Sequence, residues 1–432
     1  MSLSISNTHL IGSTHPVRIE CTNGRISAVL PADSGPADID AEGGLLIPSF
    51  CHAHIHLDKC FILDRCKLET GDFAEALRVT NEAKAAFEPQ DLYKRGTKLI
   101  RESIECGVTA MRAHVEIDRA VKFACLEAGV ELRDAFRDVC DVQVAAFAQE
   151  PLFDDAETSE PGENYTLLAQ ALEKYDVKVV GSAPYVEPTI EQAKRNIGLI
   201  LNLALAHQCH VDFHLDYNLD PSSEPLIFSV IAQANALSWP PKLRIAIGHA
   251  TRLQLFTPAQ WDELVKAIGC LPISLIGLPQ SDIYMMGRAM SRAPRGTLHV
   301  PQIAREHNLH VAMSVNNVQN AFTPQGSLDP LALCTLGVSL FQAATPNDLR
   351  TLLRAVSLTC KEAIASPNIA NDLSLSVGDP ADFVILHSSP DLASAVLNPS
   401  YDRTTVRHGV VVARRRTERW IAGPTDNSRY NL

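Results

Sequence analysis

Two histidines separated by one residue, His54 and His56, are the residues of this sequence whose types and spacing most directly suggest chemistry. They end an apolar run that begins at Leu45, and side chains two positions apart on a β-strand point to the same face. Two imidazoles on one face can bind the same metal ion. The pair alone is a weak indication, because histidines at this spacing also occur as surface or packing residues.

Other polar side chains lie at the ends of other short apolar runs. His214 and His249 each stand alone at such an end, where they could supply a third imidazole and a nearby partner for a metal site. A lone histidine at a strand end is also common as a hydrogen-bonding core residue, so these two gain weight only beside the first pair. The other polar residues at these ends are His114, Glu116, Gln149, Glu150, Asp216, Asn316 and Asn317.

The elements that must position these residues alternate along the chain. Short apolar runs are separated by longer amphipathic stretches such as 90–105 and 190–207, which is typical of parallel βα units. The alternation predicts an α/β fold, a closed (β/α)8 TIM barrel, with its active site at the carboxyl ends of the strands. An open doubly wound sheet is the alternative, but no glycine-rich phosphate loop follows an early strand. The eight predicted strands are 45–56, 108–115, 142–149, 177–186, 210–215, 243–249, 271–275 and 310–315.

Both ends of the chain have the alternating pattern of half-exposed antiparallel strands. Residues 17–29 predict a hairpin with Asn23 and Gly24 in its turn, and two further strands are expected at 381–386 and 408–412. We therefore expect two domains. Residues 1–46 and 367–432 would together form a small composite β-sandwich, and residues 47–366 would form the barrel.

Composition excludes several classes of function. The chain has 432 residues, of which 46% are hydrophobic and 20% charged, as in soluble globular proteins. Its net charge of -12 would repel nucleic acid and membranes, and the basic run 414–416 is too short to change that. The 11 cysteines include no CxxC pair, and neither a signal peptide nor a long apolar segment is evident. We expect a cytoplasmic protein whose partner is a small-molecule substrate, and leave open a homo-oligomer.

The stretch 46–50 running into 54–58, together with Gln149, His214 and His249, resembles the amidohydrolase superfamily, in particular its cytosine deaminase-like branch. The sequence is also similar to the N-isopropylammelide amidohydrolases. The resemblance covers nearly the whole chain, because the terminal strands look like the small β-sandwich of that family, with 378–383 as its usual return.

This resemblance implies roles for several residues. His54, His56 and His214 would bind a divalent metal, His249 would orient the reacting water, and Gln149 would contact the substrate. Binuclear members of the superfamily carry a lysine at the end of the fourth strand, whereas here that strand ends at 183–185 without one. We therefore expect one metal ion, zinc before iron or manganese.

Two positions depart from the family pattern. Asn316 stands where a metal-binding aspartate is expected, and Tyr217 where a glutamate is expected. Asn316 could still bind the metal through its carbonyl oxygen and belongs to the predicted catalytic group, but it cannot accept a proton. Another group must carry the proton, and the candidates are Asp216 first, then Tyr217, Asp282 and His249. A role for Asp216 as a partner of a ligand imidazole is equally open.

Lys59 is the second predicted substrate contact beside Gln149, and Tyr217 is the third. A structural ion pair at the barrel rim would explain Lys59 as well as a ligand would.

Together these patterns predict a metal-dependent hydrolase that cleaves a non-peptide C–N bond of a cyclic amide, an amidine or an N-substituted heterocycle with metal-activated water. The changes at Asn316 and Tyr217 also favour a second hypothesis, a pseudoenzyme that binds a small ligand without turnover. A third hypothesis is metal-dependent but non-hydrolytic chemistry such as decarboxylation, which other members of the superfamily perform.

Overall fold

The computed structural model describes residues 2–288, 290–418 and 420, and its centre is a sheet of eight parallel strands in sequence order. Every neighbouring pair in this sheet is parallel. The strands are β6 (Phe50–His56), β7 (Val108–Glu116), β8 (Asp141–Ala148), β9 (Val179–Ser182), β10 (His210–Leu215), β11 (Ile245–His249), β12 (Ile273–Gly277) and β13 (Val311–Met313).

The first and last strands of this sheet meet and close it into a barrel. Ile55 forms a parallel bridge with Asn316, which follows β13. The Asn316 amide donates to the His54 carbonyl at 3.1 Å, and the His56 amide donates to the Asn316 carbonyl at 2.8 Å. The predicted (β/α)8 barrel is therefore confirmed, and the open doubly wound alternative is wrong.

Helices pack around the barrel because each carries an apolar face. Helix α2 (Pro89–Glu105) buries Leu92, Leu99 and Ile100, and α5 (Ile190–His207) begins where the Thr189 side chain accepts a hydrogen bond from the Gln192 amide. Both agree with the predicted ranges to within one residue. The other long helices outside the barrel are α3 (Ala124–Phe136), α4 (Glu163–Lys174), α6 (Ile227–Ala236), α7 (Pro258–Ile268), α10 (Pro330–Leu340) and α11 (Pro346–Ala355).

Further helices complete the barrel unit. Helix α1 (Phe73–Lys84) follows the loop after β6, and α8 (Pro279–Met285) follows β12, so both start from the carboxyl ends of strands. The remaining two are α9 (Val300–Glu306) and α12 (Leu358–Ala363). Among the described helices, none combines the length and the apolar character that crossing a membrane requires.

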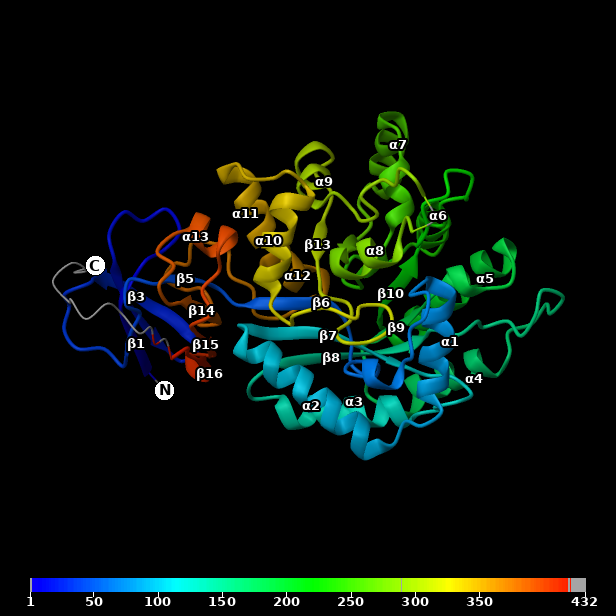
Figure 1. Cartoon of the computed structure of the whole chain (residues 1–432), viewed down its shortest axis with the longest axis horizontal. Coiled ribbons are helices and arrows are strands. Elements are labelled where there is room, and N and C mark those ends of the chain that lie inside the picture. The colour runs from blue at the N-terminus through cyan, green and yellow to red at the C-terminus, as the bar shows by residue number, and fades with distance from the viewer. Residues whose placement is uncertain (1, 289, 419, 421–432) are drawn as a thin grey trace.

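Two small sheets lie at one end of the molecule (Figure 1). One sheet has the order β3-β2-β1-β4, and the predicted hairpin forms its β2 and β3. The other has the order β16-β15-β14-β5 and is antiparallel throughout. Their strands are β1 (Ser2–Thr8), β2 (Val17–Thr22), β3 (Arg25–Pro31), β4 (Ile39–Asp40), β5 (Leu45–Pro48), β14 (Phe383–Leu386), β15 (Arg403–Arg407) and β16 (Val410–Arg415), with the short helix α13 (Leu392–Leu397) between β14 and β15.

The predicted strand 45–56 is in fact two strands in different sheets. β5 pairs with β14 of the small unit, and β6 begins the barrel. The chain changes sheet at Ser49, whose amide donates to the Asp382 carbonyl, while the next amide, of Phe50, donates to the Gly107 carbonyl. Both strands are fully buried, so an unbroken apolar run gave no sign of the change. The division into a composite unit and a barrel stays our proposal, and β5 belongs on the composite side. Within the proposed composite unit, residues 419 and 421–432 lie outside the described part of the chain.

A β-bulge in β6 sets the direction of its histidines. His52 pairs with Met111 and Ile55 with Ala113, so three residues of β6 span two of β7. Ala53 packs in the barrel interior, whereas Ile55 packs in the outer core between barrel and helices. The alternation of the strand therefore shifts by one residue at the bulge, and His54 and the residue before it both face inward.

A buried ion pair joins the small unit to the barrel unit. Arg403 on β15 binds Asp329 with two parallel hydrogen bonds of 2.6 Å, and it also donates to the Cys106 carbonyl at 2.9 Å. Asp329 in turn caps the start of α10 by accepting from the Leu331 amide. The pair thus couples a strand of the outer sheet to two helices of the barrel unit.

We predict that Arg403→Ala lowers the free energy of unfolding by about 3–5 kcal/mol, because it leaves the Asp329 carboxylate buried without its partner. Urea denaturation would measure the change. The matched control is Arg350→Ala, which removes an exposed pair with Asp372 and should cost less than about 1 kcal/mol. Equal effects of the two substitutions would contradict the coupling role of Arg403.

Candidate active site

Three imidazoles converge inside the carboxyl end of the barrel. The ring of His54 lies 5.6 Å from that of His56 and 4.4 Å from that of His214, and the rings of His56 and His214 are 5.1 Å apart. Rings that hold one zinc ion at the usual Zn–N length of about 2 Å have their centres about 5 Å apart. The spacing of the three rings therefore suits a single ion.

The polar atoms around this point have no partner in the described structure. Both ring nitrogens of His54, Nδ1 of His56, Nε2 of His214 and Oδ1 of Asn316 are buried and form no hydrogen bond. Burial, together with neighbouring positive groups, holds the pKa values of the three histidines well below 6.5, so each imidazole is neutral at pH 7. Neutral imidazoles with unused lone pairs and an amide oxygen are a suitable donor set for a divalent metal.

Asn316 is held so that its oxygen stays free. Its amide nitrogen donates to Ser281 Oγ at 2.8 Å, and that hydroxyl lies 2.6 Å from Thr323 Oγ1. The side-chain oxygen is then the only polar atom of the amide that remains unpaired. Asn316 also has a left-handed backbone with φ of 68°, a conformation that costs about 1–3 kcal/mol and is concentrated at functional sites.

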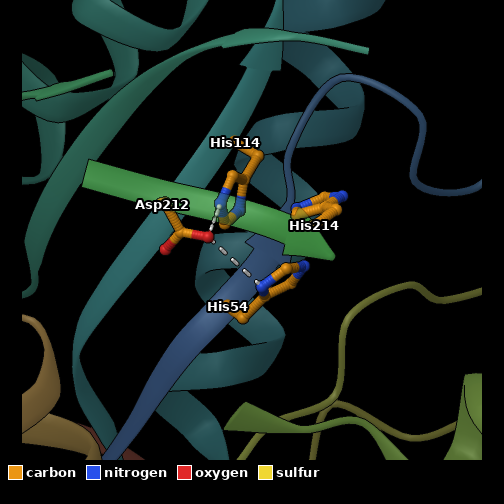
Figure 2. A group of neighbouring side chains, drawn as sticks. All are labelled: His54, His114, Asp212 and His214. Atoms are coloured by element: carbon orange, nitrogen blue, oxygen red, sulfur yellow. Dashed lines mark ion pairs between the residues drawn. The ribbon is translucent and has the colours of Figure 1, made fainter. Parts of the chain in front are cut away.

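A second grouping of possible ligand atoms lies deeper in the barrel. One donor atom each of His54, His114, Asp212 and His214 lies within 4.8 Å of the others (Figure 2). Only one oxygen of Asp212 is paired: Oδ2 accepts from Arg112 at 2.9 Å, whereas Oδ1 has no hydrogen-bond partner among the described residues. This Oδ1 lies 3.2 Å from His114 Nε2 and 3.8 Å from His54 Nδ1. Its position suits a carboxylate that supports a ligand imidazole from behind and equally one that faces the metal itself.

A third grouping, of His56, Asp58 and Glu116, is a poor cation site. The two oxygens of Glu116 accept from Lys59 at 2.8 Å and from Lys84 at 2.6 Å. Burial alone would raise the pKa of Glu116, but the two ammonium groups outweigh it and lower this pKa to about 2. A metal ion at this place would be repelled by both lysines.

The residues around the proposed metal site line a cavity of about 20 Å³, well below the usual volume of small-molecule sites. Lys59 and Gln149 form one edge of it, where Lys59 Nζ donates to Gln149 Oε1 at 3.2 Å and Gln149 Nε2 donates to Tyr185 Oη at 3.3 Å. The lining residues are His56, Lys59, Phe73, Gln149, Tyr185, His214, Tyr217, His249, Asn316, Asn317 and Phe322. His54 lies just beneath, fully buried.

Asp216 does not face this cavity, contrary to the expectation that it shares the face of His214. Its backbone is left-handed, with φ of 50°, and its carboxylate accepts from the Leu226 amide at 2.7 Å and the Ile227 amide at 3.1 Å. It therefore caps the start of α6, which satisfies two unpaired helix amides. The strand rule fails here because the chain leaves the pleated conformation at this residue.

Asp282, which sequence reasoning ranked low, is the partner of His249. His249 Nδ1 lies 2.8 Å from Asp282 Oδ1, and Asp282 Oδ2 accepts from Thr297 Oγ1 at 2.7 Å. The carboxylate accepts the Nδ1 hydrogen, so Nε2 of His249 carries a lone pair on the cavity side. The Tyr217 ring stacks on a face of the His249 imidazole, with ring centres 3.8 Å apart.

Sequence reasoning also missed the buried group of Arg112, His114 and Asp212 as a support for the ligands. A usable signal was present. Arg112, His114 and Glu116 alternate with apolar residues on β7, and Asp212 precedes His214 by two on β10. Charged residues at every second position of an otherwise apolar strand indicate an inward polar face.

No model of a known protein family matches the chain. The chain is 27% identical over 411 residues to a pterin deaminase of Rhizobium rhizogenes, which covers 92% of this chain and 87% of that protein. It is 24% identical over 391 residues to an N-isopropylammelide isopropyl amidohydrolase of a Pseudomonas species, with 87% and 88% covered.

A solved structure of similar architecture is the 5-methylcytosine deaminase of Klebsiella pneumoniae liganded with 5-fluorocytosine. It has a TM-score of 0.86 and 25% identity, with 97% of this chain and 99% of that chain covered. The barrel with its added small sheets, the histidines at its mouth and these whole-length likenesses agree. The chain is similar over nearly its whole length to deaminases and amidohydrolases, which supports its resemblance to the deaminase-like branch of the amidohydrolase superfamily.

Proposed function

We propose that this protein is a metal-dependent hydrolase that cleaves a non-peptide C–N bond of a small aminated or N-substituted heterocycle. The observation that carries the proposal is the convergence of three neutral, unpartnered imidazoles on one wall of a small cavity. The relatives named as deaminases of pterin and 5-methylcytosine, and as an N-isopropylammelide amidohydrolase, support the same reaction class.

In this proposal His54, His56 and His214 hold one divalent ion, zinc before iron or manganese, and Asn316 faces it with Oδ1. Bound there, the ion would supply Lewis acidity and make water a nucleophile at neutral pH. Asp212, whose Oδ2 accepts from Arg112, would stabilise the orientation of His54 from behind through Oδ1, which lies 3.8 Å from His54 Nδ1.

His249 is the proposed proton carrier, since Asn316 cannot accept a proton and Asp216 faces away. Its Nε2 would take a proton from the attacking water as oxygen bonds to the ring carbon. The same nitrogen would then give that proton to the leaving nitrogen as the C–N bond breaks, so the products are a ring carbonyl and ammonia or an amine. Asp282 fixes the tautomer and stabilises the transient imidazolium.

Aromatic side chains supply much of the cavity wall. Phe73 contacts both Phe322 and Tyr217 edge to face, with ring centres 5.8 Å and 5.6 Å apart. We propose that Gln149, Lys59 and Tyr217 contact the polar edge of the substrate. All 11 cysteines are free and only Cys270 is exposed, which supports the proposed cytoplasmic location.

A ligand-binding pseudoenzyme is the second candidate, favoured by Asn316 and Tyr217. The two candidates differ in a direct measurement. We expect the purified protein, loaded with zinc, iron or manganese, to release ammonia or amine from members of a panel of cyclic amides and aminated heterocycles. Carbon dioxide from carboxylated rings would instead point to a decarboxylase. If no C–N substrate reacts, and Asn316→Asp with Tyr217→Glu creates turnover, the pseudoenzyme account would hold.

We predict that His54→Ala and His214→Ala each lower the metal content of the purified protein at least 10-fold, because each removes one of three nitrogen ligands. Elemental analysis after dialysis would measure the content. His52→Gln is a matched control on the same strand, since His52 contacts Ser103 of α2 and should leave metal content unchanged. A wild-type protein that retains no metal after any loading would exclude the proposed centre.

We predict that Asp282→Asn lowers kcat about 100-fold or more, because an amide oxygen no longer stabilises a positive His249 and its NH2 favours the wrong tautomer. The comparison is Asp216→Asn, which should lower the thermal midpoint through the lost cap of α6 but change kcat less than about threefold. A large fall in kcat for Asp216→Asn alone would return the catalytic role to Asp216.

A further inference from the structure

The cavity above the histidines has an unusual balance of hydrogen-bonding groups. No aspartate or glutamate is among the described residues that line it. The nearest carboxylate on the Lys59 side, Glu116, already accepts from two lysines, and Gln149 Oε1 accepts from Lys59. Asn317 Oδ1 accepts from Asn320 Nδ2 at 2.9 Å. Apart from the imidazole nitrogens and the Asn316 oxygen, which the proposed function assigns to the metal and to proton transfer, these acceptors on the cavity walls are therefore occupied.

Several donors on the same walls remain available. Lys59 donates to Glu116 and Gln149, which leaves one of its three ammonium hydrogens without a hydrogen-bond acceptor among the described residues, although the ammonium lies 5.4 Å from the centre of the Phe322 ring. The Asn317 amide nitrogen has no partner in the part of the chain that the structure describes, since only its oxygen is bonded. Tyr185 accepts from Gln149 and so keeps its own hydrogen.

Tyr217 adds a donor where a carboxylate acceptor would otherwise stand. Its hydroxyl is buried on the cavity wall and has no hydrogen-bond partner among the residues that the structure describes. Burial holds the pKa of this phenol well above 10, so the hydroxyl keeps its hydrogen. A buried hydroxyl without a partner is unfavourable unless a ligand supplies one. The ring itself is fixed by stacking on His249, which keeps the hydroxyl in place.

We infer that the site selects a flat heterocycle with several oxo groups, which bring hydrogen-bond acceptors to Lys59, Asn317 and Tyr217, over a ring with several amino groups. This inference rests on the proposed function in assuming that the cavity holds the substrate. The substrate would then carry the leaving amine at one carbon and oxo groups at two or more others. Oxo-rich rings of this kind also lose a ring proton readily, and the resulting anion would be stabilised by the Lys59 ammonium.

Two probes of the same size and symmetry test the inference, cyanuric acid with three oxo groups and melamine with three amino groups. Isothermal titration of the metal-loaded protein should show cyanuric acid binding at least 10-fold more tightly than melamine. Equal affinities, tighter binding of melamine or no binding of either probe would overturn the inference.

Variants of Tyr217 locate the preference. Tyr217→Phe keeps the ring that stacks on His249 and should weaken cyanuric acid about 10-fold while leaving melamine unchanged. Tyr217→Glu should reverse the preference towards melamine. Tyr165→Phe on α4, outside the cavity, is the control and should change neither affinity. Unchanged binding of cyanuric acid to Tyr217→Phe would remove Tyr217 from the selection.

These titrations separate the two proposals. A protein that prefers cyanuric acid but releases neither ammonia nor amine from any heterocycle would keep the inference and contradict the proposed hydrolase. A protein that turns over a heterocycle but binds melamine more tightly than cyanuric acid would support the proposed hydrolase and contradict the inference.

Discussion

The seam between β6 and the residues after β13 is the contact on which both fold and site depend. Its two backbone hydrogen bonds run from the Asn316 amide to His54 and from the His56 amide to Asn316. Ser314 reinforces it, since its Oγ donates to the His54 carbonyl at 2.7 Å and accepts from the His54 amide at 3.1 Å. The bonds that close the barrel therefore also set the distance between the imidazoles and the Asn316 side chain.

A second constraint is the cost of burying so many polar groups in one place. Beneath the histidines this cost is met in part by pairing, because Asp212 Oδ2 accepts from Arg112, and beside them both oxygens of Glu116 accept from Lys59 and Lys84. At the centre the cost is not met, since ring nitrogens of the histidines, Asp212 Oδ1 and the Asn316 oxygen have no hydrogen-bond partner among the described residues. Unsatisfied buried atoms are costly in a folded protein, so their concentration at one point marks a place shaped for a ligand.

The sequence was enough to predict the barrel, the helices α2 and α5, the hairpin near the N-terminus and the grouping of most candidate site residues around one cavity. These features depend on local periodicity and on the rule that parallel strands end at the same rim. The rest depended on three-dimensional details. The split of the run 45–56 was hidden because both halves are buried, and the turn at Asp216 overrides strand alternation. Asp282 lies 33 residues beyond His249, in a helix whose docking no local pattern reveals.

The pairing of β5 with β14 also has a consequence for how the chain is made. The two strands are separated by more than 330 residues, and at a synthesis rate of about 5–20 residues per second β14 emerges tens of seconds after β5. The barrel seam likewise waits for residues near 316, about 260 positions after His54. Until then the first strands have open hydrogen-bonding edges on the ribosome. The nascent chain must therefore be kept from pairing with its neighbours, and the histidines of the proposed metal site can converge only after most of the chain has been translated.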